Sequence, residues 1–477
     1  MGELGAHVLV IPFPTQGHIN PILQFSKRLA SKGVKVTIVA TTLMSKSLPQ
    51  LQKAAAASIQ VDCISDGYNP DDNFSTVDEC LARFNDVVPQ TLTQLIVDKH
   101  LNSDHPPTVL IYDSVFPWAV DIAKNLGLLS AVFYTQSCSV CAIFYHFTQA
   151  NLKIPSTHES SFSLDLPPLP ALPSLKVTDL PSFIVESTES NPNIFQLVSS
   201  QFYSFGKADW IFFNSFDKLE EEVINWVLET KWAVKTIGPT VPSMYLDKKM
   251  EDDTEYGLSL FSPSTESCMH WLDSRGKSGS VVYVAFGSLA SLGEDQMEEI
   301  AQGLKNTNAP FLWVVRASEE GKLPSWFKEE TLEKGLVVNW CPQLDVLAHQ
   351  AVGCFVTHCG WNSTLEALSL GVPMVAIPQW SDQMTNTKYV VDVWKVGVRV
   401  KVNNENGFFN RDEIEVCIKQ VMEEGDEGNG HKIRQNALKW KKLAIEAVDQ
   451  GGSSDTNIQE FVSTISLLNT QQGVDLY

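Results

Sequence analysis

The sequence has few positive charges and no long hydrophobic run. Lysine and arginine number 35 against 56 aspartate and glutamate residues, which gives a formal net charge of −21 at pH 7. This balance argues against a nucleic-acid-binding protein, which needs a basic face for phosphates, and against attachment to an anionic membrane surface. No apolar run reaches the ~18 to 20 residues of a spanning helix, and the opening MGELGAHVLVIPF lacks the basic region of a signal peptide. We therefore expect a cytoplasmic protein without membrane insertion.

The sequence also lacks the patterns of common metal and dinucleotide sites. Its nine cysteines are odd in number and scattered, which favours reduced thiols over a disulfide framework. Cys138 and Cys141 form a C-x-x-C pair, and Cys354, His358 and Cys359 lie close together, but zinc would need a second matched pair. The sequence contains no Asp-x-Asp motif that would suggest a Mg²⁺ site. The dinucleotide-binding motif G-x-G-x-x-G is also missing after either opening strand. We expect no metal site.

What the sequence contains is an alternation of apolar runs and amphipathic stretches. A length of 477 residues favours two or three domains, and 44% hydrophobic against 19% charged residues is typical of a globular protein. Near-continuous apolar runs separated by helical patterns predict parallel strands buried on both faces. In the first half we expect strands at 6–13, 34–41, 59–65, 108–114, 129–135 and 208–215, with 235–242 leaving the sheet, a helix at 77–101 and a Pro-rich loop at 155–182.

The first helix has recognisable candidates for both of its ends. Asn20 is a good cap with Pro21 at the first helical position, and Gly33 is a good C-terminal stop. These boundaries place His18 in the loop at the carboxyl end of the first strand. Open α/β sheets bind their ligands at that edge.

The pattern restarts after residues 243–262, a stretch of charges and turn formers that we interpret as an interdomain linker. Ser291 and Glu294 form a capping box that predicts the start of a helix. Two consecutive doubly wound α/β halves with a crevice between them are therefore expected. Their second half has expected strands at 280–288, 309–316, 335–340, 353–358 and 373–378, and expected helices at 411–424, at 431–448 and after Gly452.

The segment from Thr357 to Glu366 has the composition of an anion-binding turn. A strand ends, a glycine permits a tight turn, and small polar residues open a helix whose free backbone amides favour a pyrophosphate. Asn362, Ser363 and His358 add side-chain donors. Ser363 and Glu366 also match a capping box, so a purely structural role stays open at this point.

Two further sets of residues lie at expected strand ends. Trp340 offers a face on which a base can stack, with Gln343 in reach of a ribose hydroxyl, although Trp at a strand end commonly packs in a core. His18 and Asp113 fall at strand ends of the first half. A carboxylate bonded to one imidazole nitrogen fixes the tautomer and leaves the other nitrogen as a general base. A loop histidine without a catalytic role is the alternative.

The 44 residues from Trp340 to Gln383 resemble the signature box of the plant family-1 UDP-sugar-dependent glycosyltransferases. The stretches PFPTQGHINP before and after His18, YDS at Asp113 and AFGS at Ser288 are similar to that family as well, and the similarity covers essentially the whole chain. The resemblance implies the GT-B fold, in which two Rossmann-like doubly wound domains face each other across a crevice. It implies an acceptor-binding domain at 1–245 joined by a returning helix at about 456–477, a linker at 246–262, and a UDP-sugar-binding domain at 263–455.

Matched by position, the resemblance also implies which residues bind the donor. The uracil would be held by Trp340 and the Cys341 backbone, and the ribose by Gln343 and Glu366. The diphosphate would be held by Ser288, His358, Asn362, Ser363 and the Gly17 amide, and the sugar by Thr135, Trp361, Asp382 and Gln383. A glutamine at the last position of the box goes with glucose in this family, so Gln383 favours UDP-glucose as the co-substrate.

The chemistry implied by the resemblance is an inverting, metal-independent transfer with His18 as general base and Asp113 as its partner. The expected acceptor is a small apolar plant metabolite with a hydroxyl or carboxyl group, such as a phenolic or hormone-type acid or a terpenoid. Its pocket is predicted to be lined by Phe116, Trp118, Phe133, Phe144 and Tyr145, with core packing as the alternative for each. A monomer is expected from family habit. A non-catalytic nucleotide-sugar binder and a nicotinamide-dependent oxidoreductase are the two alternative classes.

Overall fold

The computed structural model describes residues 6–54, 59–69, 72, 76–149, 152, 165–185, 192–230, 232–250, 253, 264–403, 407–423, 425 and 428–474. The chain folds into two compact units. The first, unit 1, comprises Met1–Leu260 together with Ile445–Tyr477, and the second, unit 2, comprises Phe261–Ala444. Among the described residues, no helix has both the length and the apolar character needed to span a membrane.

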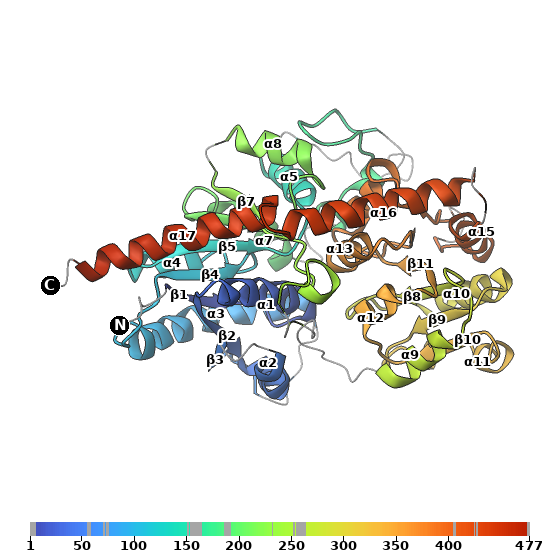
Figure 1. The fold of residues 1–477 in the computed structure, drawn as a ribbon, viewed down its shortest axis with the longest axis horizontal. Helices are drawn as coiled ribbons and strands as arrows, with labels where there is room; N and C mark the ends of the chain where they lie inside the picture. Colours follow the sequence, from blue (N-terminus) through green and yellow to red (C-terminus); the bar gives the residue numbers. More distant parts are fainter. Residues whose placement is uncertain are drawn as a thin grey trace. The chain divides into compact units, whose positions relative to one another are not determined.

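Unit 1 is built on a parallel sheet whose strand order is β3-β2-β1-β4-β5-β6-β7 among the described residues (Figure 1). Its order reverses beside β1, so the first strand and β4 lie side by side although about a hundred residues separate them. The apolar runs of the sequence form these strands, and the central strands β1 and β4 are buried on both faces, whereas the edge strand β3 exposes Gln60 and Cys63. The strands are β1 His7–Ile11, β2 Lys35–Thr41, β3 Ile59–Ile64, β4 Val109–Asp113, β5 Leu129–Tyr134, β6 Trp210–Phe213 and β7 Val234–Thr236.

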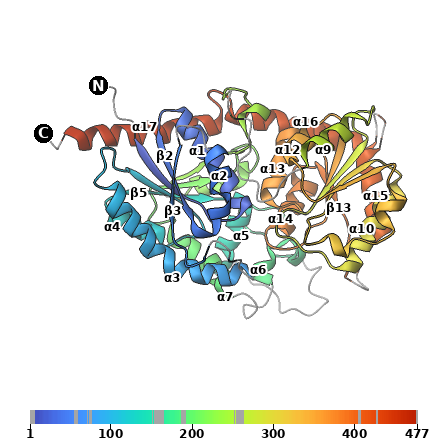
Figure 2. The same ribbon diagram turned by 90° about the horizontal axis from the view of Figure 1, so that it is seen from below.

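Helices cover both faces of this sheet. Figure 2 shows α1 and α17 on one side of the sheet and α3 on the other. The helices are α1 Gln16–Ser31, α2 Leu48–Ala54, α3 Val77–Leu95, α4 Ala119–Asn125, α5 Cys138–Thr148, α6 Ser182–Val185, α7 Pro192–Ser200, α8 Glu221–Leu228 and α17 Ser453–Val474, with a π-helical turn Ile96–His100 and 3₁₀ turns Thr42–Ser47, Val177–Asp179, Gln201–Tyr203 and Ser243–Tyr245.

The C-terminal helix α17 belongs to unit 1 because its apolar residues enter the core beneath the sheet. Ile458, Phe461 and Ile465 are buried together with residues of α1 and β1. The Phe461 ring lies 5.0 Å from the Phe212 ring of β6. Lys32 after α1 also bonds the Asp455 carboxylate at 2.7 Å. Residues from the end of the chain therefore stabilise the sheet formed by its beginning.

Unit 2 repeats the same design with the strand order β10-β9-β8-β11-β12-β13 among the described residues. Its strands are β8 Val281–Ala285, β9 Phe311–Val314, β10 Gly335–Val338, β11 Val352–Thr357, β12 Met374–Ala376 and β13 Gly397–Arg399. Its helices are α9 Thr265–Asp273, α10 Glu294–Thr307, α11 Phe327–Glu330, α12 Gln343–Ala348, α13 Trp361–Leu370, α14 Gln383–Lys388, α15 Arg411–Met422 and α16 Asn429–Val448, the last of which crosses into unit 1 after Ala444, with a 3₁₀ turn Glu320–Lys322 and a π-helical turn Tyr389–Val393. The short strand β13 was not expected from the sequence, because three residues carry no clear period.

Two helix starts expected from the sequence are wrong. Helix α1 begins at Gln16 after Thr15, so Asn20 and Pro21 lie inside it, and His18 lies in its first turn rather than in a loop. Pro21, the sixth residue of α1, lies beyond the four N–H groups that lack intrahelical acceptors, so it removes one i→i−4 hydrogen bond from the helix. Helix α10 begins at Glu294 after Gly293 without a side-chain cap.

The buried residue His7, at the opposite end of β1 from His18, makes the stability of unit 1 depend on pH. Its ring donates from Nδ1 to the His105 carbonyl at 2.8 Å and pairs through Nε2 with the Thr37 hydroxyl at 2.9 Å. Burial lowers the pKa of His7 from 6.5 to about 4. The unfolded chain therefore takes up the proton first as pH falls, and stability declines between pH 6.5 and pH 4.

We expect His7→Gln to flatten this decline. The native His7 contributes a loss of about 2 kcal/mol in unfolding free energy between pH 7 and pH 5, since one pKa unit corresponds to about 1.4 kcal/mol. Urea titrations of both proteins at the two pH values, followed by far-ultraviolet circular dichroism, measure the difference. An equal decline in the wild type and His7→Gln would show that this histidine does not set the pH dependence.

Candidate active site

In unit 1 the sheet brings His18 and Asp113 together. Strand β1 pairs in parallel with β4, with Ile11 opposite Tyr112, so the residues that follow both strands meet at the same edge. Asp113 is the last residue of β4, and His18 lies in the first turn of the helix that follows β1. The distance from His18 Nδ1 to Asp113 Oδ2 is 2.8 Å.

Surrounding groups fix the orientation of this pair. The Asp113 side chain is fully buried, and its two oxygens also accept the backbone N–H groups of Phe13 at 3.4 Å and Val115 at 3.2 Å. Because an ionised carboxylate only accepts hydrogen bonds, the proton of the neutral imidazole lies on Nδ1. Among the described residues Nε2 forms no hydrogen bond, and 26% of the His18 side chain is exposed. The lone pair of Nε2 is therefore available to take a proton from outside.

Thr135 lies beside the same imidazole. It follows strand β5, the next neighbour of β4, and its Oγ1 is 3.2 Å from His18 Nδ1. The Phe13 ring contacts the imidazole edge-on at 5.4 Å between ring centres. Residues that follow three neighbouring strands of the sheet, β1, β4 and β5, thus define the position of the His18 ring. The family resemblance implied that Thr135 lies near the sugar, but it offered no sign of this contact with His18.

In unit 2 the structure tests the capping-box interpretation of Ser363 and Glu366. Helix α13 begins at Trp361 with Gly360 at its N-cap position, so Ser363 and Glu366 lie within the helix. The capping-box interpretation of these two residues is therefore wrong. Glu366 is buried with 3% of its surface exposed, and its carboxylate accepts a hydrogen bond from Gln343 Nε2 at 2.6 Å.

The two residues expected to hold the ribose therefore contact each other. Gln343 opens helix α12 and bonds Ser363 Oγ at 3.0 Å in addition to Glu366. Its Oε1 accepts from the hydroxyl of Tyr283 at 3.0 Å, and that hydroxyl also lies 3.2 Å from Cys341 Sγ. Tyr283 lies in β8, outside the signature segment, and the sequence analysis missed it. An aromatic residue in the otherwise aliphatic strand VVYVA was its only signal.

The half-buried imidazole of His358 lies beside two glycines. A Cβ added at Gly287 or at Gly360 would lie within 2.8 Å of its Nε2, so both positions require glycine, and Gly287 also has φ +74°. Burial lowers the pKa of His358 to about 4. The imidazole is thus neutral at physiological pH, and it can offer an anion an N–H donor rather than a positive charge.

The loop that carries Ser288 is held by a second set of contacts. The Arg316 guanidinium at the end of β9 donates to the carbonyl groups of Ser288 and Ala290. Glu319 accepts from Ser291 Oγ at 3.1 Å and lies 3.8 Å from Arg316. Ser291 therefore anchors this loop instead of capping a helix. Arg316, also missed by the sequence analysis, is the single charge in the strand APFLWVVR.

The end of the signature segment is ordered by backbone contacts. Gln383 is 5% exposed, and its Oε1 accepts the backbone N–H groups of Gln379 at 2.8 Å and Trp380 at 3.1 Å. This fixes the amide so that its NH₂ group faces away from those donors. Asp382 accepts from Asn386 Nδ2 at 2.7 Å, and the same group bonds the Cys359 carbonyl at 3.0 Å. Asn386 was not predicted and links the turn at Cys359 to Asp382.

Of the remaining residues predicted to bind the donor, all lie in unit 2 except Gly17, which lies in unit 1. Trp361 is 4% exposed and lies 6.1 Å from the Trp394 ring. Asn362 follows it in the first turn of α13, and Trp340 and Cys341 lie between β10 and α12, with the Trp340 carbonyl accepting from Ser264 N–H at 3.0 Å. Gly17 lies next to His18 in unit 1.

The aromatic residues predicted to line the acceptor pocket are dispersed. Phe133 has no exposed surface and packs on Phe25 in the core beneath the sheet. Phe144 is buried in a separate cluster with residues of the 165–185 segment. Phe116 is fully buried, but its ring is 6.1 Å from that of Phe13, which contacts His18. The Trp118 indole is half-buried and donates to Asn85 Oδ1 at 3.0 Å.

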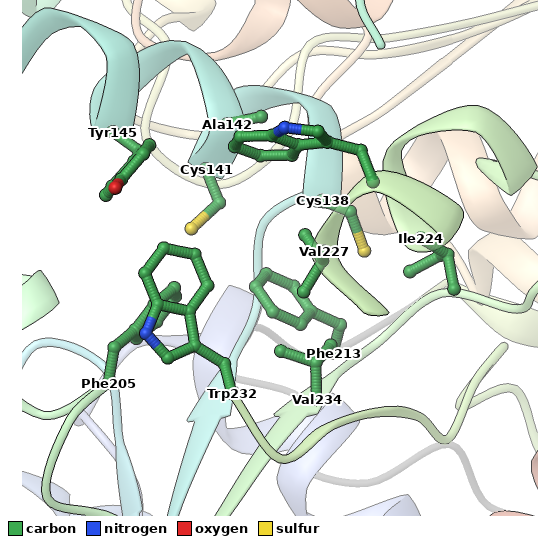
Figure 3. A pocket seen from close by; sticks show the side chains of 11 residues that line it. Cys138, Cys141, Ala142, Tyr145, Phe205, Phe213, Ile224, Val227, Trp232 and Val234 are labelled. Carbon is green, nitrogen blue, oxygen red and sulfur yellow. The ribbon is translucent and has the colours of Figure 1, made fainter. Parts of the chain in front are cut away.

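Tyr145 lines a narrow apolar pocket with about 10 Å³ of free space between α5, α8 and β7 (Figure 3). Its ring lies 5.0 Å from that of Trp232. The thiols of Cys138 and Cys141 also face this space, and burial raises the pKa of both well above the usual value, so both keep their protons. Phe205, Phe213 and Val234 complete the apolar wall that Figure 3 labels.

The described residues offer no ligand set for a metal ion. No group of three or more histidine, cysteine, aspartate or glutamate side chains in that part of the chain could hold one.

The two parallel α/β units, with polar side chains at the carboxyl ends of their strands, have the architecture of a nucleotide-sugar transferase. The family model of UDP-glucoronosyl and UDP-glucosyl transferases matches residues 6–426. A mogroside I-E synthase of Siraitia grosvenorii is 49% identical over 96% of this chain and 98% of its own length. A flavonol 7-O-beta-glucosyltransferase of Arabidopsis thaliana is 47% identical over 98% of this chain and 100% of its own.

A solved structure extends this similarity to the fold. Os79 from O. sativa, crystallised in complex with UDP, superimposes with a TM-score of 0.86 at 37% identity, covering 96% of this chain and 100% of Os79. The chain belongs to the UDP-glucoronosyl and UDP-glucosyl transferase family. It is a UDP-glycosyltransferase with the GT-B fold.

Proposed function

We propose that this protein transfers glucose from UDP-glucose to a hydroxyl or carboxyl group of a small apolar plant metabolite, with inversion at the anomeric carbon and without a metal ion. The observation that carries the catalytic part is the bond between His18 Nδ1 and the fully buried Asp113, which leaves Nε2 exposed as a base. Unit 1 supplies this base and the acceptor site in the proposal, and unit 2 supplies the donor site.

In this mechanism the His18 imidazole removes the proton of an acceptor hydroxyl as its oxygen attacks the anomeric carbon. The C–O bond to UDP breaks on the opposite face, so an α-linked donor gives a β-glucoside. Asp113 stabilises the imidazolium that forms. The diphosphate that leaves is stabilised by the neutral His358, by Ser288, Asn362 and Ser363, and by amides at the start of α13.

The choice of glucose rests on Gln383 and on the relatives. Backbone N–H groups occupy the Gln383 oxygen, so its NH₂ group is the part left to bond a sugar hydroxyl. One relative is named a flavonol glucosyltransferase, and a flavonol is an apolar phenol. The Gln383 amide supports a glucosyl donor through its match to the family's signature position, and the name of the relative supports a glucosyl donor and an aromatic hydroxyl acceptor.

Measuring UDP release from UDP-glucose across a panel of phenols, aromatic acids and terpenoid alcohols tests the proposal. We expect release well above the hydrolysis blank with at least one acceptor, slower release from UDP-galactose, and no effect of a chelator. The product of a carboxyl acceptor is an ester, and mild alkali cleaves it, which separates the two acceptor types. Release at the blank rate with every acceptor, combined with tight UDP binding, would instead favour a non-catalytic nucleotide-sugar binder.

A further inference from the structure

A buried hydrogen-bond network connects the strand β8 to the residues expected to hold the ribose. It contains Cys341, Tyr283, Gln343, Ser363 and Glu366, and only Tyr283 comes from outside the signature segment. The Tyr283 ring is 1% exposed and stacks on Phe355 of the neighbouring strand β11 at 4.8 Å between ring centres. The packed ring holds its hydroxyl at one position in the sheet.

The direction of each hydrogen bond in this network is determined by Glu366. A carboxylate can only accept, so the Gln343 group 2.6 Å from Glu366 Oε2 must be its NH₂ group. The second hydrogen of that NH₂ group is directed to Ser363 Oγ at 3.0 Å. The Gln343 oxygen consequently faces Tyr283, whose hydroxyl donates to it at 3.0 Å.

Cys341 completes the chain of donors. Its Sγ lies 3.2 Å from the Tyr283 oxygen, and burial raises the pKa of both groups, so thiol and phenol keep their protons. The thiol can then donate to the phenol while the phenol donates to Gln343. Both hydrogens of the Gln343 amide are thus committed within the protein, and the amide acts on Glu366 and Ser363 rather than as a freely rotating donor.

We infer that Tyr283 is a positioning residue for ribose recognition, because its hydroxyl fixes the Gln343 amide and, through it, the carboxylate of Glu366 that would bond the ribose hydroxyls. This inference rests on the proposed UDP-sugar donor. It predicts that Tyr283 contributes to the preference for ribose over 2′-deoxyribose in the donor, although it does not itself contact the nucleotide.

Removing only this hydroxyl gives a sharp test. In Tyr283→Phe we expect UDP to bind about threefold to tenfold more weakly, the range of one net hydrogen bond. Binding of 2′-deoxy-UDP should change little, because that ligand lacks one of the two hydroxyls that Glu366 would bond. The ratio of the two dissociation constants, measured by calorimetry on the full-length protein, should therefore shrink in the variant.

Two further variants separate this role from a structural one. Tyr134→Phe removes another buried tyrosine hydroxyl, which donates to the Gln201 carbonyl at 3.1 Å in unit 1, and should leave the ratio unchanged. In Gln343→Ala the additional change Tyr283→Phe should have no further effect on the ratio, because the two residues act through one network.

The outcomes distinguish this inference from the function on which it rests. If the wild type binds neither UDP nor 2′-deoxy-UDP, the proposed donor is wrong. If the wild type prefers UDP and Tyr283→Phe keeps the same preference, the donor assignment stands and the role of Tyr283 is refuted. Equal weakening of both ligands in Tyr283→Phe, or no preference in the wild type, would also refute it.

Discussion

Replacement of His18 by alanine is expected to reduce glucose transfer to a hydroxyl acceptor by ~10² to 10⁴-fold, the usual contribution of a general base. The loss should fall on kcat, because the base takes the acceptor proton in the transition state rather than contributing to substrate binding. The dissociation constant of UDP should stay near the wild-type value, because the residues proposed to hold UDP lie almost entirely in unit 2. Steady-state kinetics and UDP titration measure the two quantities.

A matched control is His349→Ala. This histidine of unit 2 bonds Asp273 at 3.1 Å and the N–H of Ala351, away from every residue assigned to the site. It should retain wild-type kcat. Wild-type turnover of a phenol by His18→Ala would reject His18 as the base.

The variant His18→Ala also shows whether the enzyme uses a hydroxyl or a carboxyl group of the acceptor. A carboxylic acid is already ionised at neutral pH and needs no base. His18→Ala should therefore lose much less activity toward an aromatic acid than toward a phenol.

Asp113→Asn is expected to lower kcat strongly, though by less than His18→Ala, with UDP binding unchanged. The two Asp113 oxygens accept from Phe13, Val115 and His18, so an amide in their place brings its NH₂ group against one of these donors. If the NH₂ group faces His18, the imidazole adopts the wrong tautomer and Nε2 carries the proton. If it faces Val115, two donors meet and the site is strained. In both cases the imidazolium loses the charge that stabilises it.

Asp209→Asn is the matched control for Asp113→Asn. That carboxylate accepts the N–H of Ser130 at 2.8 Å and its hydroxyl at 3.0 Å, at the opposite end of β5. It should alter stability without a specific loss of kcat. If Asp113→Asn had the kcat of the wild type, the proposed dyad would be wrong.

Most strands of the two sheets, β13 excepted, could be predicted from the sequence because they are apolar runs, and the central ones are buried on both faces. The expected runs 6–13, 34–41 and 108–114 contain β1, β2 and β4, and only their ends differ by one to two residues. The helix starts were less predictable. Asn20 and Ser363 have the chemistry of caps, but the helices begin earlier, after Thr15 and Gly360.

The sequence by itself determined the fold class and the family, because a contiguous segment from Trp340 to Gln383 carries the signature. Only the tertiary structure decided which side chains meet. His18, Asp113 and Thr135 follow three different strands, and the order β1-β4-β5 in the sheet is what brings them within 3.2 Å. Tyr283 and Arg316 act through single contacts that leave no local pattern. Phe133 and Tyr145 lie in similarly apolar stretches of the sequence. Only the tertiary structure shows that Phe133 is buried in the core and that Tyr145 lines a pocket.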